Sequence, residues 1–290
     1  MADIPASLVK QLRDQTGAGM GACKKALEET GGDLAKALEF LRAKGVKADV
    51  AERAAAEGAV SFKLTPDQRA VAVVELRCET DFAARSDNFQ KLLGAISEAV
   101  LKARPADAEA AKAIPAVAEG LKEAGAMTIR ENLVLSHAEV KAIEGEGAIG
   151  CYAHHNGTVG AAVGFRTPAG AAGKPAFQEL AREVAMHVTA HDPRPLAVNR
   201  EEIPADMVER ERAIYMKQLD EDPKESKKPA NIKEKVVEGR LRKFYEERAL
   251  LEQKFVKDPE QSITALLDKA SKELGGKVEI VWFVRRQVGA

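Results

Sequence analysis

The chain is poor in aromatic residues, which make up only 4% of its 290 positions. It also has only three cysteines, Cys23, Cys78 and Cys151, which lie far apart and lack the spacing of metal-binding motifs. The scarcity of aromatic side chains disfavours the large aromatic-lined ligand cavity of many metabolic enzymes. The cysteine pattern supports neither a zinc site nor a disulfide framework, and it fits free thiols in a reducing compartment.

An excess of charge of either sign is also lacking, since 44 Lys and Arg residues face 45 Asp and Glu residues. No global field would therefore draw the protein onto nucleic acid or an anionic membrane, so any role with nucleic acid would have to be local. No stretch approaches the roughly 18 apolar residues of a membrane span, and residues 1–11 have no apolar run. We predict a cytoplasmic protein that has no membrane partner.

The length allows two or three compact units, and their boundaries can be placed from the residue patterns. Residues 1–55 predict a module of three short helices followed by a linker. Ser7 can cap the first helix and Asp33 the third, and the linker falls at residues 47–57. We place an N-terminal core subdomain at residues 56–140 and a C-terminal core subdomain at residues 141–290, with a helical hairpin at about residues 200–250.

The two core subdomains alternate strand signals with helix signals, which predicts an α+β fold. Asn156-Gly157 is typical of a tight turn between two antiparallel strands. The expected strands are 59–64, 70–78, 131–142, 150–155, 158–165 and 278–284, and the expected helices are 87–103 and 176–190.

Two charge-rich helical segments, residues 204–220 and 231–251, flank a polar stretch that contains Pro223 and Pro229. Because prolines break a continuous helix, the pattern predicts an antiparallel helical hairpin. We expect one set of apolar residues to face another across it: Met207, Val208, Ile214, Tyr215 and Leu219 against Val236, Val237, Leu241 and Phe244.

The second arm of this hairpin is locally basic, which leaves an RNA-binding helical-hairpin protein as an alternative function. Its basic residues are Arg240, Arg242, Lys243 and Arg248. Glutamates interleave with them at spacings that allow pairs within the helix, so a solvated face is favoured over a nucleic-acid interface.

The most informative stretch runs from Ala72 to Phe82, where an apolar strand ends in an acid and an aromatic residue. One face of the strand is wholly apolar, whereas Glu75 and Arg77 predict that the other face is partly solvated. Ser86 or Asp87 can cap the helix that follows, so the segment between them is a strand-to-helix connection. The local pattern leaves two interpretations of Phe82 open: it folds back into the core, or it is held out for a partner.

Motifs for chemistry are weak throughout the chain. Residues 145–150 satisfy G-x-G-x-x-G, but a hairpin strand follows where a phosphate site needs a helix. His187 and His191 have the spacing of metal ligands on a helix but no third ligand in a fixed relation to them. His154 lies beside a hairpin tip, where structural and functional roles are equally plausible. We predict no catalytic residue, no metal site and no cofactor.

Three segments together resemble one protein family. They are Leu8 to Leu27 with its Thr16-Gly17-Ala18-Gly19-Met20 turn, Cys78-Glu79-Thr80-Asp81-Phe82, and the late helix Glu234 to Phe244 with its Val-Glu-Gly-Arg run. All three are similar to bacterial translation elongation factor Ts, in the same order along the chain. The resemblance implies a guanine nucleotide exchange factor for the GTPase elongation factor Tu (EF-Tu), acting on its nucleotide-free or GDP form. It also implies an N-terminal ubiquitin-associated-like module, a two-part α+β core and an antiparallel helical-hairpin (coiled-coil) insertion.

The resemblance further implies the residues that contact EF-Tu. Asp81 and Phe82, flanked by Thr80 and Ala83, would enter the GTPase near its nucleotide, disturb the magnesium site and so promote GDP release. Ile129-Arg130-Glu131-Asn132 is similar to the family's Ile-Gly-Glu-Asn, and Tyr152-Ala153-His154 to its Tyr-x-His, which adds Ile129 and His154 to the contact. The chain departs from the family at Ala83, where valine is usual, at Arg130, and at Gly21-Ala22. The helical hairpin can pack on itself, on a second copy of the chain or on the partner, so a homodimer is one open arrangement.

Overall fold

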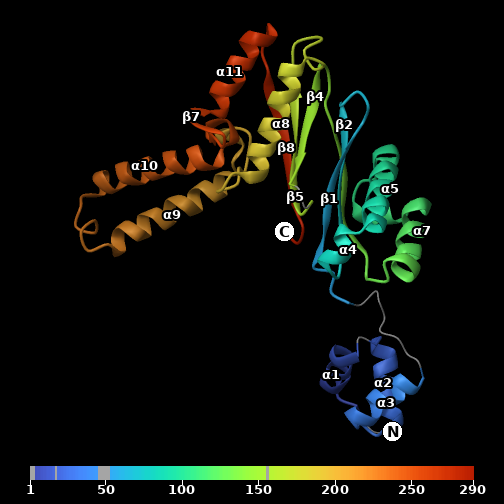
Figure 1. Cartoon of the computed structure of the whole chain (residues 1–290). Coiled ribbons are helices and arrows are strands. Elements are labelled where there is room, and N and C mark those ends of the chain that lie inside the picture. The colour runs from blue at the N-terminus through green and yellow to red at the C-terminus, as the bar shows by residue number, and fades with distance from the viewer. Residues whose placement is uncertain (1–3, 17, 45–52, 155–156) are drawn as a thin grey trace.

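The structure, a computed structural model, describes residues 4–16, 18–44, 53–154 and 157–290. Three helices come first, two antiparallel three-stranded sheets form the centre, and a long pair of helices projects from the second sheet (Figure 1). Both of these sheets are antiparallel and each is covered on one face by helices, which confirms the predicted α+β class. Among the described residues, no helix combines the length and the apolar character that crossing a membrane requires.

The N-terminal helices are α1 (Ala6–Thr16), α2 (Met20–Glu29) and α3 (Leu34–Ala43). They pack around a cluster of their own that includes the fully buried Leu12, Cys23 and Leu27. Asp33 caps α3 as predicted, because its Oδ1 accepts hydrogen bonds from the backbone N–H groups of residues 35 and 36. The predicted cap at Ser7 is wrong, since α1 already begins one residue earlier. Most of the predicted linker lies outside the described residues.

The N-terminal sheet has the order β1-β2-β3, with β1 at Glu57–Leu64, β2 at Ala70–Cys78 and β3 at Val134–Ala142. One face is covered by α5 (Asp87–Ala103), which Ser86 caps by accepting from the N–H of Phe89. The predicted strand at 70–78 and helix at 87–103 are confirmed. The strand predicted from residue 131 begins three residues later, because residues 131 and 132 bond instead to Glu79, the residue that follows β2.

The C-terminal sheet has the order β4-β5-β8, with β4 at Gly147–Ala153, β5 at Val159–Arg166 and β8 at Glu279–Gln287. Helix α8 (Pro175–Ala190) covers its outer face and closes the largest apolar cluster of the described chain. The closing strand predicted at 278–284 and the helix predicted at 176–190 are both present. Gly150 lets β4 approach α8, since a Cβ there would lie 2.4 Å from the Ala181 carbonyl oxygen.

The two sheets pack face to face, and this packing corrects one prediction. Val71 and Val73 of β2 meet Ile149 of β4 and Ala162 of β5 in a buried layer between the sheets. The Glu75 face of β2 is therefore covered, and Glu75 itself is 0% exposed. The pattern of β2 could not reveal this, because the partner sheet comes from residues far along the chain.

The projecting helices are α9 (Ala205–Glu221) and α10 (Ala230–Arg248), which pack against each other as the predicted antiparallel hairpin (Figure 1). Leu219, Val237 and Leu241 form the buried contact between them. Ile214, expected to face the second arm, is 47% exposed, so that part of the predicted contact is wrong.

The remaining elements complete the two subdomains and their connections. They are α4 (Asp81–Arg85), α6 (Ala108–Lys112), α7 (Pro115–Glu123), η2 (Ala124–Thr128), η3 (Arg200–Glu202), η4 (Leu250–Glu252), β6 (Lys254–Phe255), β7 (Asp258–Ser262) and α11 (Ile263–Leu274).

Candidate functional site

The segment after β2 forms a short helix, α4, rather than an irregular connection. Thr80 caps it in an extended conformation, and its Oγ1 accepts a hydrogen bond from the N–H of Ala83 at 3.2 Å. Asp81 and Phe82 therefore lie in the first helical turn, which corrects the prediction of a simple loop. A capped turn fixes the direction of its side chains better than a loop does.

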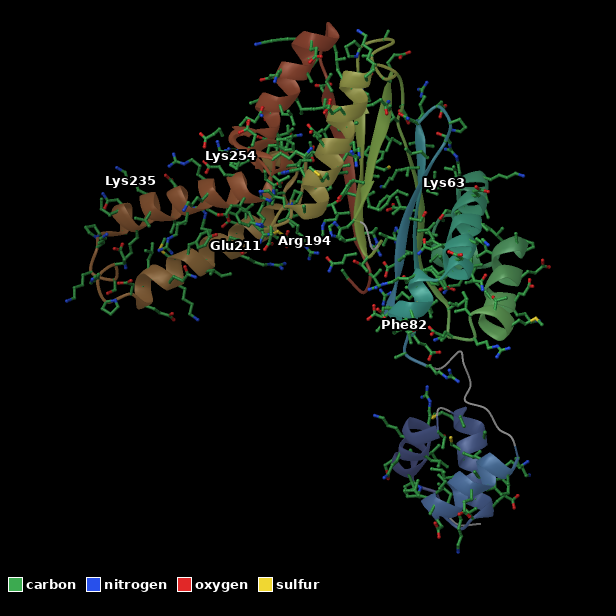
Figure 2. The ribbon with its side chains drawn as sticks, in the orientation of Figure 1. Lys63, Phe82, Arg194, Glu211, Lys235 and Lys254 are labelled. Atoms are coloured by element: carbon green, nitrogen blue, oxygen red, sulfur yellow. The ribbon has the colours of Figure 1, made fainter. Side chains whose placement is uncertain are left out.

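Phe82 points into solvent with 84% of its surface exposed (Figure 2). The next two residues, Ala83 and Ala84, are buried in the cluster between α5 and β2, so α4 rests on the core by its opposite face. Of the two interpretations left open by the sequence, the one in which Phe82 folds back into the core is therefore wrong. Exposing this ring forgoes about 1.5–3 kcal/mol of burial free energy, which a partner can recover.

Asp81 supplies the polar neighbour of the exposed ring. Its carboxylate lies 3.3 Å from the Arg85 guanidinium, one turn further along α4, and both side chains are largely solvated. A carboxylate in the first turn also suits the positive end of the helix dipole. Because the pair is exposed, its contribution to stability is small and Asp81 can exchange its partner at low cost.

Two glutamates hold the start of α4 by a reciprocal set of hydrogen bonds. The Glu131 carboxylate accepts from the backbone N–H groups of Glu79 and Thr80, at 2.9 and 3.0 Å, and from the Thr80 hydroxyl at 2.6 Å. In return, the Glu79 carboxylate accepts from the backbone N–H of Asn132 at 2.8 Å. Hydrogen bonds to a charged acceptor are among the stronger ones, so α4 is anchored to the chain before β3.

Cys78 supports the same turn from the core side. It is fully buried, and its Sγ donates to the carbonyl oxygen of Thr80 at 3.2 Å. Burial, helped by the nearby Glu131 carboxylate, raises the pKa of the Cys78 thiol to about 12. At neutral pH the thiol is therefore protonated and serves as a donor rather than a nucleophile.

The segment that carries Glu131 also holds Ile129, whose side chain is half-buried against the N-terminal core cluster. Met127, two residues earlier, is 68% exposed. Arg130 has a positive φ of 61°, the left-handed conformation that favours glycine. The family that this chain resembles usually has glycine here, so arginine replaces glycine at a position where glycine fits best.

We predict that Arg130→Gly stabilises the protein by about 0.5–1 kcal/mol, because it removes the steric cost of the left-handed conformation. Chemical unfolding in urea measures this gain. Arg130→Ala is the matched control, since alanine keeps the Cβ and the strain while losing the hydrogen bond from Nε to the Met127 carbonyl. A gain with alanine equal to that with glycine would contradict the strain argument.

His154 lies in the connection between β4 and β5, and its side chain is exposed. The Gly157 carbonyl of this connection accepts from the Val60 N–H at 2.8 Å, which lays the connection against β1. Because β1 begins at Glu57, opposite Cys78 at the end of β2, the connection between β4 and β5 lies at the same end of the two sheets as α4 (Figure 1). The Asn156 half of the predicted turn lies outside the described residues, whereas Gly157 has the expected positive φ of 69°.

The structure brings Thr80, Asp81, Phe82 and Ala83 together on α4, with Ile129 and His154 on neighbouring segments. Sequence reasoning did not assign a role to Glu79 or Glu131. In the sequence, only their place inside the two motifs that resemble the family marks these glutamates. No local pattern reveals their contact, because it joins residues more than fifty positions apart.

His187 and His191 do not form a metal site. His187 is fully buried in the core; its Nε2 lies 2.9 Å from Gln253 Oε1, and its Nδ1 accepts from the N–H of Val256. Burial lowers the pKa of His187 to about 4, so the ring is neutral at physiological pH. No group of three or more potential metal ligands gathers within the described parts of the chain.

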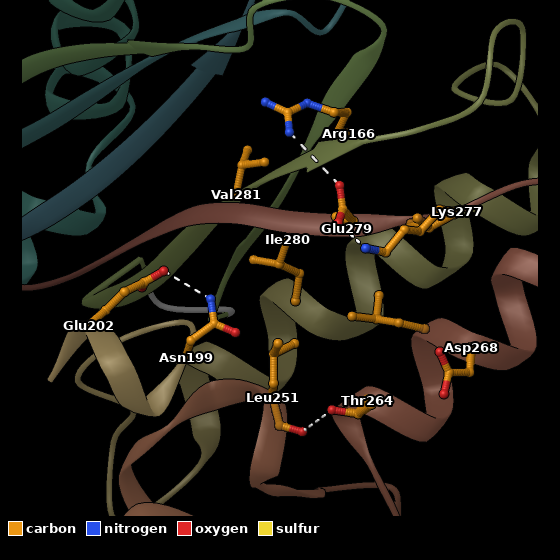
Figure 3. A pocket seen from close by; sticks show the side chains of 12 residues that line it. Arg166, Asn199, Glu202, Leu251, Thr264, Asp268, Lys277, Glu279, Ile280 and Val281 are labelled. Carbon is orange, nitrogen blue, oxygen red and sulfur yellow. Dashed lines mark hydrogen bonds and ion pairs between the residues drawn. The ribbon is translucent and has the colours of Figure 1, made fainter.

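A cavity of about 540 Å³ lies on the C-terminal subdomain, between β8 and α11 (Figure 3). Three of its charged groups pair with one another, since the Glu279 carboxylate is 3.8 Å from Arg166 and 2.5 Å from Lys277. Thr264 donates to the carbonyl of Leu251 in the same wall. This cavity contains none of the residues of the α4 site.

An aromatic side chain held in solvent on an anchored turn is suited to binding another protein. The fold and the site therefore define the class of proteins that act by binding another protein. The model of the family described as Elongation factor TS matches residues 79–290.

Full-length relatives agree with this match. Elongation factor Ts of Rhizobium rhizogenes is 42% identical over 301 residues, covering 100% of this chain and 94% of the relative. The protein of the same name from Desulfovibrio desulfuricans is 39% identical, covering 100% of this chain and 100% of the relative. The one from Nitratiruptor sp. is 37% identical, covering 99% of this chain and 93% of the relative. The chain belongs to the elongation factor Ts family, and its function is guanine nucleotide exchange on EF-Tu in translation elongation.

Proposed function

We propose that α4 is the part of this exchange factor that opens the nucleotide site of EF-Tu. Phe82 enters the GTPase near its bound nucleotide, with Asp81 beside it, and together they disturb the magnesium site so that GDP is released. The 84% exposure of Phe82 on an anchored turn is the observation that carries this proposal. Thr80 acts through its cap and Ala83 through its packing on the core, so both hold the ring in place.

The mechanism needs no covalent chemistry. Burying the Phe82 ring in a partner contributes about 1.5–3 kcal/mol, which is enough to shift an equilibrium between two states of the GTPase but not enough to hold the complex alone. The N-terminal helices and the C-terminal sheet would supply the remaining contact. We therefore propose a factor that acts by binding alone and is not an enzyme in the sense of making or breaking bonds.

Thermodynamic linkage adds a consequence. If the protein weakens the binding of nucleotide to EF-Tu by a given factor, nucleotide weakens the binding of the protein to EF-Tu by the same factor. GDP or GTP should therefore displace it from EF-Tu, which frees it for another cycle. Ile129 and His154 would contact the GTPase beside Phe82, His154 through its exposed ring and Ile129 through its half-exposed side chain.

The finer organisation is part of the same proposal. Residues 1–55 would form a ubiquitin-associated-like module and linker, residues 56–140 and 141–290 the two core subdomains, and the α9–α10 pair a coiled-coil insertion. We expect the protein to act in the cytoplasm with EF-Tu as its partner, and with neither nucleic acid nor a membrane. A homodimer through α9 and α10 is a further arrangement that the exposed Ile214 side chain would suit.

Substitution of Glu131 tests whether the anchored position of α4 matters. We predict that Glu131→Ala slows GDP release from EF-Tu by about tenfold, because the charge-assisted bonds to Thr80 and Glu79 are worth about 1.5–3 kcal/mol each. The rate is measured from the fluorescence of labelled GDP after mixing.

Glu98→Ala is the matched control for this experiment. Glu98 also lies in the N-terminal subdomain, but among the described residues its carboxylate forms only an exposed ion pair with Lys63 at 2.8 Å. Two results would contradict the proposed role of the Glu131 hydrogen bonds. One is an exchange rate that falls equally in both variants, and the other is a wild-type exchange rate in a folded Glu131→Ala protein.

A further inference from the structure

A second cavity, of about 450 Å³, lies at the base of the helical hairpin. Three arginines line it from three different segments: Arg194 from the loop after α8, Arg248 from the last turn of α10, and Arg285 from β8. Figure 2 labels Arg194 where the hairpin joins the C-terminal sheet. The cavity is thus a junction at which three parts of the fold each contribute a guanidinium.

The positive charge of this cavity is neutralised only in part by the described residues that line it. Among the described residues that line it, Asp192 carries the only carboxylate. None of the three guanidiniums forms an ion pair in the described part of the chain, in contrast with Arg200 nearby, which lies 2.6 Å from the Glu252 carboxylate. In a chain with a net charge of −1, such a local excess of cations is a distinct feature.

Two of the guanidiniums are already held in position. Arg285 donates from Nε to the Thr189 carbonyl at 3.4 Å and from Nη2 to Gln287 Oε1 at 3.1 Å. Arg248 donates from Nη1 to the carbonyl of Arg194 at 3.3 Å. A guanidinium has several more N–H donors than these contacts use, so both can bind a ligand without losing their supports.

The electrostatics of Arg285 point in the same direction. Burial lowers its pKa from the usual value, and repulsion from the Arg194 charge lowers it further, while Asp192 opposes this only in part. An anion placed among the three groups would relieve both effects. Sites of this kind gain much of their binding free energy from charge that is already assembled.

We infer that this cavity is a binding site for a small phosphate-bearing anion. Guanidinium groups match the oxygens of phosphate through paired hydrogen bonds, more closely than a lysine ammonium does. The volume suits a small ligand. The described lining includes no Phe, Tyr or Trp on which a base could stack, so recognition would rest on the phosphate group itself.

Titration calorimetry with inorganic pyrophosphate tests this site on the full chain. The wild-type protein should bind pyrophosphate, and Arg248→Gln and Arg194→Gln should each weaken binding by about tenfold, the effect of removing one charge-assisted contact. Arg194 is exposed on a loop, so its variant keeps the test valid if Arg248→Gln folds poorly. Circular dichroism confirms that each variant is folded.

Arg242→Gln is the matched control, because Arg242 is exposed on the same helix as Arg248, carries the same charge and lies outside the cavity. Its affinity should equal that of the wild type. Absence of pyrophosphate binding would overturn the site. An equal loss of pyrophosphate affinity in Arg242→Gln would also overturn it, because it would show a diffuse electrostatic effect. A short RNA that binds through Arg248 without competition from pyrophosphate would also overturn it, since a phosphodiester chain would then be the ligand.

Discussion

Phe82→Ala should slow the release of GDP from EF-Tu by about tenfold to a hundredfold, because it removes the 1.5–3 kcal/mol that burial of the ring would supply. The ring would act on the phosphate region of the GTPase, whereas most of the contact area would lie elsewhere. Affinity for nucleotide-free EF-Tu should therefore fall less than the exchange rate does. Displacement of fluorescent GDP gives the rate, and calorimetry gives the affinity.

Two further variants sharpen this experiment. Phe82→Leu keeps much of the apolar surface and should recover part of the lost rate. Ile214→Ala removes another exposed apolar side chain, on the helical hairpin, and should leave the rate unchanged. A wild-type rate with Phe82→Ala would reject the assignment of the ring to the nucleotide site, and a slow Ile214→Ala variant would move the exchange surface to the hairpin.

The periodic parts of the fold could be predicted because their signals are local. The sequence predicts a strand at 70–78 and a helix from residue 87 to about 103, with Ser86 or Asp87 as its cap, and the structure has both elements there. Alternation, helical spacing and a cap each depend on the residues of one segment. The hairpin of α9 and α10 followed equally from two helical segments separated by prolines. Its detailed contacts were less accurate, as the exposure of Ile214 shows.

The site depended on contacts that no local pattern contains. Whether Phe82 is buried or exposed is decided by the seating of Ala83 and Ala84 on the core, and by the bonds from Glu131 to the start of α4. The partner of Glu75 was equally hidden, because Arg286 follows it by more than two hundred residues. Long-range pairing of this kind needs the folded chain.

Glu75 is the residue whose loss should cost most stability. Its buried carboxylate accepts from Arg77 Nε at 2.7 Å within the N-terminal sheet, and from Arg286 Nη2 and the Gly289 N–H, both at 3.1 Å, at the end of the C-terminal sheet. Glu75→Gln keeps the shape but leaves two arginines without their counter-charge. Breaking a buried pair in this way costs about 3–5 kcal/mol.

Unfolding in urea, followed through tryptophan fluorescence, measures this loss. Trp282 is the only tryptophan and packs in the layer between the sheets, with its Nε1 donating to the Ala142 carbonyl, so it reports on the interface that Glu75 joins. Glu98→Gln breaks an exposed pair and should cost less than about 1 kcal/mol. Equal losses in the two variants would show that the buried carboxylate contributes no more than a surface one.

The pH dependence separates the charge of Glu75 from its shape. Burial alone would raise its pKa, but the hydrogen bonds from Arg77 and Gly289 outweigh burial and hold the pKa below the usual value of 4.5. Stabilisation from a carboxylate with a lowered pKa is fully present above the unfolded value and is lost as the pH falls through the folded one. The stability difference between wild type and Glu75→Gln should therefore be largest at neutral pH and shrink below pH 4.5. A difference that stayed constant into that acidic range would assign the loss to packing of the amide rather than to the ion pairs that join the two sheets.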